Sequence, residues 1–210
     1  MRTSATAQVN AFEEASRHTM KRMILNSVLY SVITGVLLGV AYPLLISGLA
    51  RVLFPQQAAG SLIYRNGVLV GSHLIGQPFT GPTYFWSRPS VAGTGYDASS
   101  SGGSNYAPTN AALISRVNAS VQVLKPATGT SVPVDLVTAS ASGLDPDISP
   151  AAALYQVPRI ALKRHLSEDT VRALVTAHIT PRQFGILGEP RVNVLELNLA
   201  LDDLTGASKK

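Results

Sequence analysis

The longest uninterrupted hydrophobic segment of the chain lies near its N-terminus. Residues 23–50 form 28 consecutive positions without Asp, Glu, Lys, Arg or His. At about 1.5 Å per residue a helix of this length measures about 42 Å, which exceeds the roughly 30 Å hydrocarbon core of a bilayer. We therefore predict a transmembrane helix over residues 23–50. A cleaved signal peptide is the alternative, but its apolar core usually has about 7–15 residues, so we favour a retained anchor.

The charged residues on either side of this span predict its orientation. Four basic residues precede it: Arg2, Arg17, Lys21 and Arg22. Only Arg51 and then Arg65 follow it closely. Because basic residues are enriched on the cytoplasmic side of a span, we predict a single-pass protein of the cell (inner) membrane. Its segment 1–22 would be cytoplasmic and its domain 51–210 extracytoplasmic.

Small residues recur along the predicted span. Every fourth position carries serine, glycine or proline: Ser27, Ser31, Gly35, Gly39, Pro43 and Ser47. Gly35 and Gly39 form a GxxxG motif, which lets another helix approach closely. We predict that this row packs against spans of partner chains, and that Pro43 kinks the helix because it removes a backbone hydrogen bond. The alternative is a lipid-facing anchor in which the small residues are incidental.

The beginning of the predicted domain combines a hairpin signal with an irregular stretch. Asn66-Gly67 separates two apolar runs within residues 60–72, which predicts a β-hairpin with a two-residue type I′ turn. Residues 77–109 are rich in Gly, Pro, Ser and Thr, which favours irregular structure. They also contain clustered aromatic residues, which are rare in disordered segments: Phe79, Tyr84, Phe85 and Trp86. A long ordered loop is usually functional or an interface.

The remaining pattern mixes helical and strand-like segments. A helix is predicted from Thr109 or Asn110, on the strength of one apolar face: Leu113, Ile114, Val117, Val121 and Leu124. Residues 133–139 predict a strand, and residues 192–197 predict another that leads into a short helix. The fold class is therefore α+β.

Two further helices are predicted between these strands. Ser149-Pro150 is typical of a helix start, and Pro158 must kink this helix or begin a second segment. Ser167 begins the next helix, and Pro181 ends it. Inward-facing residues are expected on both: Leu154 and Val157 on the first, and Val171, Leu174, Val175 and Ile179 on the second.

Charge and composition exclude several classes of function. The net charge is +5, and the 17 Lys and Arg are spread along the chain, so no nucleic-acid-binding arm is predicted. The chain has no cysteine, which excludes disulfides and thiol chemistry. It lacks the motifs of phosphate loops, dinucleotide-binding turns and zinc proteases, and its four histidines are scattered. We therefore predict no catalytic residue and no metal site.

Two polar clusters have alternative interpretations. Residues 99–105 permit either a nest of N–H groups for an anion or a tight loop, and we favour the loop. Asp145 and Asp147 flank Pro146, which is typical of a turn before a helix rather than of a pair of catalytic carboxylates.

Several long stretches resemble one protein family. They are GSLIYRNGVLVGSHLIGQPFTGPTYFWSRPS, SGGSNYAPTN, VPVDLVTASASGLDPDISPAAALYQVPRIA and GEPRVNVLELNLALD, together with AYPLLISGLA at the end of the span. In this order they cover most of residues 41–203. The chain resembles the C subunit of the Kdp high-affinity potassium-transporting P-type ATPases. Its segment 1–22 is longer than is usual in that family.

The resemblance implies a non-catalytic subunit of a hetero-oligomeric complex. Its partners would be a potassium-channel-like subunit, a P-type ATPase subunit and a small stabilising peptide, within the lipid bilayer and without nucleic acid. The complex would handle ATP and potassium, and no cofactor is expected on this chain. The family has also been described as a catalytic chaperone that raises the pump subunit's affinity for ATP through a glutamine. Gln156 is the residue carried over, with Gln77 and Gln183 as alternatives.

The predicted topology conflicts with direct nucleotide contact, because ATP is cytoplasmic and residues 51–210 are predicted outside. We favour Gln156 as a residue that meets a carbonyl freed by Pro158. Our leading hypothesis is a structural subunit whose domain lies over the mouth of the pore subunit. The alternatives are a cytoplasmic nucleotide-binding cochaperone and a freestanding anchored or secreted binding or enzyme domain. The expected partner-contact surface is in the irregular loop: Phe79, Tyr84, Phe85, Trp86, Gly102, Gly103 and Asn105.

Overall fold

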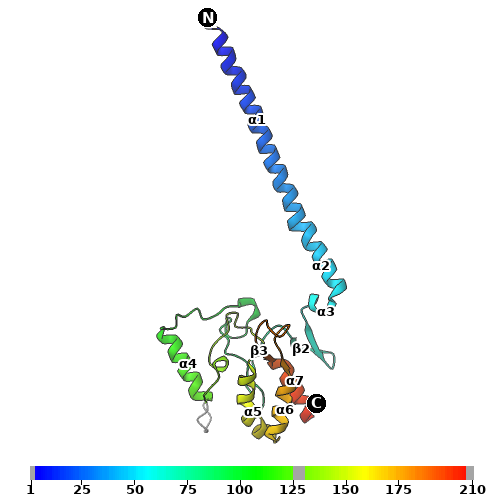
Figure 1. Ribbon diagram of the computed structural model, residues 1–210, viewed down its shortest axis with the longest axis vertical. Coiled ribbons are helices and arrows are strands. Elements are labelled where there is room, and N and C mark those ends of the chain that lie inside the picture. Colours follow the sequence, from blue (N-terminus) through cyan, green and yellow to red (C-terminus); the bar gives the residue numbers. More distant parts are fainter. Residues whose placement is uncertain (1–2, 125–130, 207–210) are drawn as a thin grey trace. The chain divides into compact units, whose positions relative to one another are not determined.

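A computed structural model describes residues 3–124 and 131–206, with side chains from residue 19 onward. The chain divides into two compact units, residues 1–59 and 60–210. Over its described length the first unit is helical except for a break at Phe54 and a turn at Ala59 (Figure 1). Its elements are α1 (Thr3–Val36), the π-helical turn η1 (Leu37–Ala41), α2 (Tyr42–Leu53) and α3 (Pro55–Ala58).

The predicted span coincides with the apolar portion of this helix. Among the described residues, one helix is long and apolar enough to cross a membrane, over Thr19–Leu53. The π turn lies directly before Pro43, and its widened hydrogen bond runs from the Tyr42 N–H to the carbonyl of Leu37. Proline has no N–H to donate and its ring crowds the carbonyl four residues earlier, here Gly39. The structure therefore accommodates Pro43 by widening the preceding turn.

The π turn also affects the row of small residues from Ser27 to Ser47. In a straight α-helix each four-residue step advances by about 40°, so the row would wind through about 200°. A π turn takes up about one extra residue and sets the following helix back by about 100°. The row is thereby kept within about a third of the helix circumference.

The second unit begins with the predicted hairpin. Strands β1 (Leu62–Arg65) and β2 (Val68–Ser72) pair antiparallel, with an irregularity between Ile63 and Tyr64. Asn66 and Gly67 have φ values of 50° and 79°, and the two positive values confirm a type I′ turn. A two-stranded hairpin is marginal alone; Arg65 ties this one to the domain by donating to the carbonyl of Leu199 at 3.2 Å.

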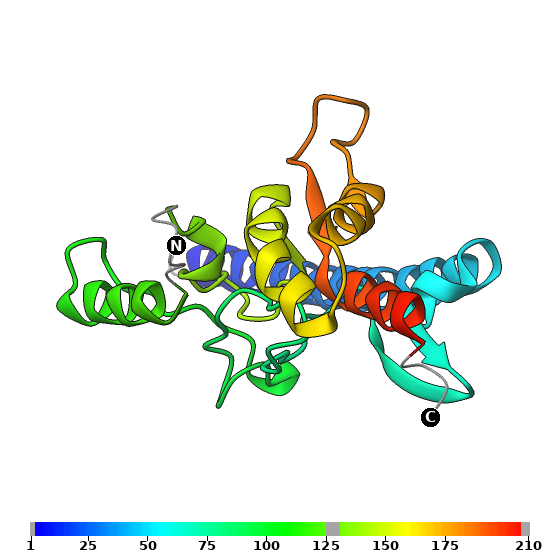
Figure 2. The same cartoon turned by 90° about the horizontal axis from the view of Figure 1, so that it is seen from below.

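A small sheet and three helices form the core of the domain. The sheet has the order β3-β5-β4, with β3 (Asp147–Ile148) and β4 (Ile179–Thr180) both antiparallel to β5 (Arg191–Asn193). The helices are α5 (Pro150–Arg164), α6 (Glu168–Ala177) and α7 (Val194–Thr205) (Figures 1 and 2). Their fully buried side chains meet in one cluster: Val157, Ile160, Val171, Val175, Leu197 and Leu201.

Capping residues explain where these helices begin. Ser149 accepts a hydrogen bond from the N–H of Ala152, and Ser167 accepts one from Thr170, which confirms both predicted helix starts. α5 continues through Pro158 as one helix, so the predicted second segment is wrong. α6 ends at Ala177, and Ile179 begins β4 instead of completing the helical stripe.

The two other predicted strands are wrong, one entirely and one over most of its length. Residues 133–139 contain a 3₁₀ helix, η3 (Val134–Leu136), because local bonds and the acceptor role of Asp135 toward the N–H of Ser149 favour a turn. The strand predicted over residues 192–197 stops at Asn193, whose side chain accepts from the N–H of Glu196 and caps α7. The alternation of apolar residues did not distinguish a strand from a turn or a helix in these segments. A tertiary contact in one and a helix cap in the other determine the structure.

The long stretch between β2 and α4 (Ala111–Leu124) is irregular, as predicted. Its one regular element is a short 3₁₀ helix, η2 (Ala98–Ser100), and the Asn110 side chain caps α4. The described residues of the loop nevertheless include buried ones, Phe85 and Ala92 among them. The prediction that aromatic residues order this stretch is confirmed.

Candidate functional site: an aromatic loop held by buried amides

Two buried amide side chains hold the aromatic loop in place. On α7, Asn198 accepts from the N–H of Phe85 at 2.8 Å and donates to its carbonyl at 3.0 Å. On α5, Gln156 accepts from the N–H of Trp86 at 2.8 Å and donates to its carbonyl at 3.1 Å. Each amide therefore replaces the neighbouring strand that this irregular backbone lacks. Consecutive residues of the loop are fixed to two different helices.

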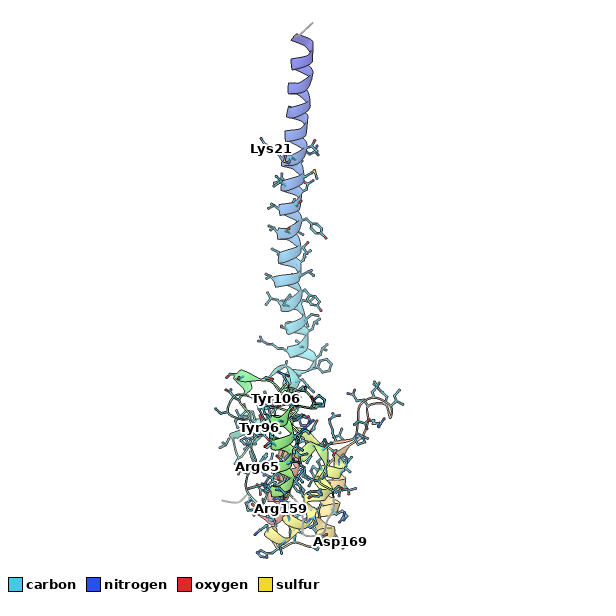
Figure 3. All side chains as sticks on the ribbon, turned by 90° about the vertical axis from the view of Figure 1, so that its left-hand side faces the viewer. Lys21, Arg65, Tyr96, Tyr106, Arg159 and Asp169 are labelled. Carbon is cyan, nitrogen blue, oxygen red and sulfur yellow. The ribbon has the colours of Figure 1, made fainter. Side chains whose placement is uncertain are left out.

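Two arginines strengthen this attachment. Arg159 lies 3.8 Å from the centre of the Trp86 ring and donates to the carbonyls of Pro82 and Tyr84 at 2.6 and 3.0 Å (labelled in Figure 3). Burial lowers the pKa of Arg159 to about 10. Its guanidinium group therefore remains charged at neutral pH and stabilises backbone carbonyls that water does not reach fully.

Arg164, further along α5, binds the loop in the same way. It lies 4.7 Å from the Tyr84 ring centre, donates to the carbonyl of Thr83 at 2.9 Å and pairs with Asp202 of α7 at 2.7 Å. Tyr84 also donates to Asp202 at 3.2 Å. The loop, α5 and α7 are thus joined by charge-assisted hydrogen bonds as well as by apolar packing.

The structure divides the predicted contact residues of the loop into buried and accessible groups. Phe85 is fully buried in the core, so the expectation of a partner contact is wrong for this residue. The partly or fully accessible ones are Phe79, Tyr84, Trp86, Gly102, Gly103 and Asn105. They do not form one cluster by the described contacts, although the Phe79 and Tyr84 rings lie 5.8 Å apart.

The glycine-rich stretch, residues 99–105, packs against the segment that contains Ala141 and Ser142. The N–H of Gly102 donates to the carbonyl of Ser142 at 2.9 Å, and a Cβ atom at Gly103 would lie 3.0 Å from the carbonyl oxygen of Ala141. Asn105 has a positive φ of 51°. These contacts favour the tight-loop interpretation over an anion-binding nest.

Gln156 has no polar group left for a nucleotide. Its side chain is 2 % exposed. Besides the pair to Trp86, its oxygen accepts from Arg159 at 2.7 Å and its nitrogen donates to the carbonyl of Ala152 at 3.3 Å. The predicted bond to a carbonyl freed by Pro158 is also wrong, because that carbonyl belongs to Leu154 and Gln156 donates elsewhere. The two glutamines named as alternatives to Gln156 are in different environments. The amide nitrogen of Gln77 donates to the carbonyl of Val70, and Gln183 is exposed.

Three carboxylates near β3 also have partners within the domain. A cleft of about 400 Å³ contains Asp135, Asp145 and Asp147. Asp145 pairs with Arg88 at 3.1 Å and Asp147 with Arg191 at 2.9 Å. Burial, reinforced by the negative charge of Asp145 and opposed by Arg191, raises the pKa of Asp147. Within residues 19–124 and 131–206 no cluster of His, Asp and Glu has the arrangement of a metal site.

The accessible side of the aromatic loop adjoins an apolar groove. Its volume is about 330 Å³, and it lies between Trp86 and the exposed residues of α4, with Leu124 and Leu136 in its lining. Val123 on the rim is largely exposed. An ordered apolar surface of this kind is typical of protein contacts.

The span offers a second apolar surface. Side chains of the apolar helix are exposed along its described length, and a Cβ atom at Gly35 or Gly39 would meet nothing within 4 Å beyond the adjacent residues and backbone of its own helix. Sequence inspection found this row, but it missed Asn198 and Arg164. An amide in the middle of the apolar stretch of α7 was the available signal, since buried amides require partners.

Comparisons with known proteins identify the family. The family model for KdpC, the c chain of K⁺-transporting ATPases, matches residues 24–203. A potassium-transporting ATPase KdpC subunit from Acidobacterium capsulatum is 62 % identical over 181 residues, which are 85 % of this chain and 96 % of the relative. The corresponding subunit of Koribacter versatilis is 58 % identical over 184 residues, 87 % of this chain and 95 % of the relative.

A third relative, the KdpC subunit of Rhodospirillum rubrum, is 56 % identical over 179 residues, 84 % of this chain and 92 % of the relative. The family model extends from the apolar helix into α7, and the relatives match 84–87 % of the chain, so together they define its class, a subunit of potassium-transporting ATPases. The chain belongs to the KdpC family. The predicted resemblance is thereby confirmed.

Proposed function

We propose that this chain is a non-catalytic accessory subunit that an ATP-driven potassium import complex needs for assembly and stability. ATP hydrolysis and potassium passage belong, in this proposal, to the P-type ATPase and channel-like partner subunits. A small stabilising peptide completes the complex. The family membership supports this role, as do two ordered apolar surfaces in a chain whose buried polar groups hold its own fold.

The observation that carries the proposal is the open row of small residues on the span. Gly35 and Gly39 have free space above their backbone, and the π turn keeps the row on one side of the helix. Small residues let the backbones of neighbouring membrane helices come close enough for dispersion contacts to accumulate. The row therefore suits a helix of a partner subunit better than lipid chains alone.

Replacing Gly35 and Gly39 by leucine tests this packing. The pair Gly35→Leu/Gly39→Leu should lower the amount of partner subunits that co-purify with the chain in detergent by at least about tenfold, a loss of about 1.4 kcal/mol or more in association. Gly48→Leu is the matched control, because Gly48 lies outside the row and also has open space above it. Unchanged co-purification of the double variant, or equal loss in the control, would contradict the proposed packing.

We further propose that the α+β domain is extracytoplasmic and lies over the mouth of the channel-like subunit. The basic residues before the span support this orientation. The accessible side of the aromatic loop, with Trp86 and its neighbouring groove, is the proposed contact surface. From there the domain would stabilise the assembly or influence ion entry.

The chaperone role implied by the family resemblance then needs a route other than Gln156. In this proposal the subunit changes the pump's affinity for ATP by stabilising the assembled complex. The four hydrogen bonds of the Gln156 amide support this view, because they leave it no donor or acceptor for a nucleotide.

A further inference from the structure

A loop with an apolar tip projects from the domain between β4 and β5. It spans residues 181–190 and is visible as the orange loop that extends away from the helices in Figure 2. Its most exposed large side chains are Phe184 at 91 %, Ile186 at 75 % and Leu187 at 54 %. We call residues 184–187 the apolar tip. These three large apolar residues in four positions are more than half exposed and contribute little to the packing of this chain.

Hydrogen bonds within the loop satisfy part of the backbone of the apolar tip. Gln183 and Leu187 exchange both backbone hydrogen bonds at 2.9 Å, and the N–H groups of Gly185 and Ile186 donate within the loop at 3.1 Å. The N–H groups of residues 185–187 therefore do not have to be stripped of water when the tip enters an apolar medium.

Phe184 is also held in an unfavourable backbone conformation. Its φ is 52°, in the left-handed region that bulky residues rarely adopt. Glycine or asparagine would fit this position without strain, and no packing inside the domain compensates for a phenylalanine that is almost entirely exposed. The residue is therefore explained by something outside the chain.

The base of the loop is electrically neutral and is bounded by two prolines. Arg182 pairs with Glu189 across it at 2.5 Å, and Pro181 and Pro190 stand at its ends. The opposite charges of Arg182 and Glu189 cancel, so this pair adds no net charge next to the apolar tip. Because proline restricts the backbone at both ends, less conformational entropy is lost when the tip is immobilised.

The link between the span and the domain is short. At most about 30 Å of chain separates the end of α2 at Leu53 from the start of β1 at Leu62, so a bilayer that holds the span is within that length of chain from β1. Within the domain, the loop lies toward the end at which β1 begins, opposite Asp169 (Figures 1 and 3).

We propose that the apolar tip, Phe184 to Leu187, inserts into the interface of the lipid bilayer as a second, shallow membrane contact. Aromatic and branched apolar side chains at a loop tip partition into the boundary between headgroups and acyl chains. The contact would fix the orientation of the domain about its short link. It requires the span to be in a membrane, but it does not require the proposed role in complex assembly.

A depth-sensitive fluorescent label tests this contact. The chain has no cysteine, so Gln183→Cys places a single label beside the tip and leaves the three apolar side chains intact. Asp169→Cys, at the far end of the domain, is the control position. Both full-length chains are placed in phosphatidylcholine nanodiscs whose acyl chains carry bromine, which quenches fluorescence at contact distance. The matched variant adds Phe184→Ser, Ile186→Ser and Leu187→Ser to Gln183→Cys.

The proposal predicts that brominated lipid removes most of the fluorescence of the label at residue 183, little of that at residue 169, and little in the triple-serine variant. The same should hold when the partner subunits are co-reconstituted. Two results would overturn it. One is an unquenched label that becomes shielded from iodide only when the partners are present, which assigns the tip to a protein surface. The other is a label open to iodide in both preparations, which leaves the tip in water.

Discussion

At the scale of single residues, the domain depends on amides that act as substitutes for a strand. Gln156 and Asn198 are 2 % and 1 % exposed, and each binds both backbone polar groups of one loop residue. Buried backbone groups need partners, and the irregular aromatic loop cannot supply them from within itself. The amides thus allow an ordered surface without regular secondary structure.

Removing the Gln156 amide should therefore destabilise the fold. Gln156→Ala leaves the N–H and carbonyl of Trp86 without their partners, and unpaired buried groups cost about 1–3 kcal/mol each. We expect the free energy of unfolding to fall by about 2–4 kcal/mol. Urea titration of the full-length chain in detergent measures it, with the fluorescence of Trp86, the chain's one tryptophan, as the probe.

Gln122→Ala is the matched control, because Gln122 is an exposed glutamine on α4. It should change the free energy of unfolding by less than about 0.5 kcal/mol. A Gln156→Ala variant with unchanged unfolding but a raised KM for ATP in the assembled complex would instead return Gln156 to a direct role at the nucleotide.

Contacts of this kind could not be predicted from the sequence. The order of the aromatic stretch was predictable from its composition, but Phe85 and Trp86 meet residues 113 and 70 positions away. Nothing local distinguishes the buried Phe85 from the partly exposed Tyr84 and Trp86 beside it. Burial here is decided by which side chain faces the α5–α7 core, which is a property of the folded chain.

At the scale of elements, the sequence was informative where a local cap or turn decides the structure. Asn66-Gly67, Ser149 and Ser167 each specify a backbone geometry with their own atoms, and the corresponding hairpin and helix starts are confirmed. Residues 133–139 and 192–197 carry apolar alternation that also fits a short turn or a helix face. In those two segments the side chains of Asp135 and Asn193 determine the local structure. They accept hydrogen bonds from the backbone N–H groups of Ser149 and Glu196.

The strand pair β3–β5 should respond to pH through Asp147. Burial raises the pKa of its carboxyl above 3.8, its ordinary value. A proton is then bound more tightly in the folded than in the unfolded state, so this residue favours folding below pH 3.8, and the contribution is lost as pH rises through the folded pKa. Asp147→Asn removes the titration.

We therefore expect the free energy of unfolding of the unmodified chain, minus that of the Asp147→Asn variant, to decrease between about pH 3.5 and pH 7. The ion pair to Arg191 forms only when Asp147 is ionised and therefore opposes this trend, but burial outweighs it. Urea titrations at a series of pH values measure the difference. A difference that grows with pH would show that the ion pair outweighs burial.

At the scale of the whole molecule, two units carry two different kinds of surface. Residues 1–59 provide an apolar helix whose small-residue row is open, and residues 60–210 provide a rigid domain with an aromatic loop. The family explains why both are present, because a subunit of a potassium-transporting ATPase acts next to other membrane chains. Length predicted the span from the sequence, and the flanking charges predict a direction that stays a prediction. The π turn at η1 and the loop attachments could be found only in the structure.

The side of the membrane on which the domain lies decides between the accessory subunit proposed here and a cytoplasmic nucleotide-binding cochaperone. Fusions of alkaline phosphatase and of a cytoplasm-only reporter after Lys210 measure it directly, with fusions after residue 20 as the reversed control. Our account predicts phosphatase activity and no cytoplasmic reporter signal from the fusion after Lys210. A cytoplasmic reporter signal there, without phosphatase activity, would contradict it.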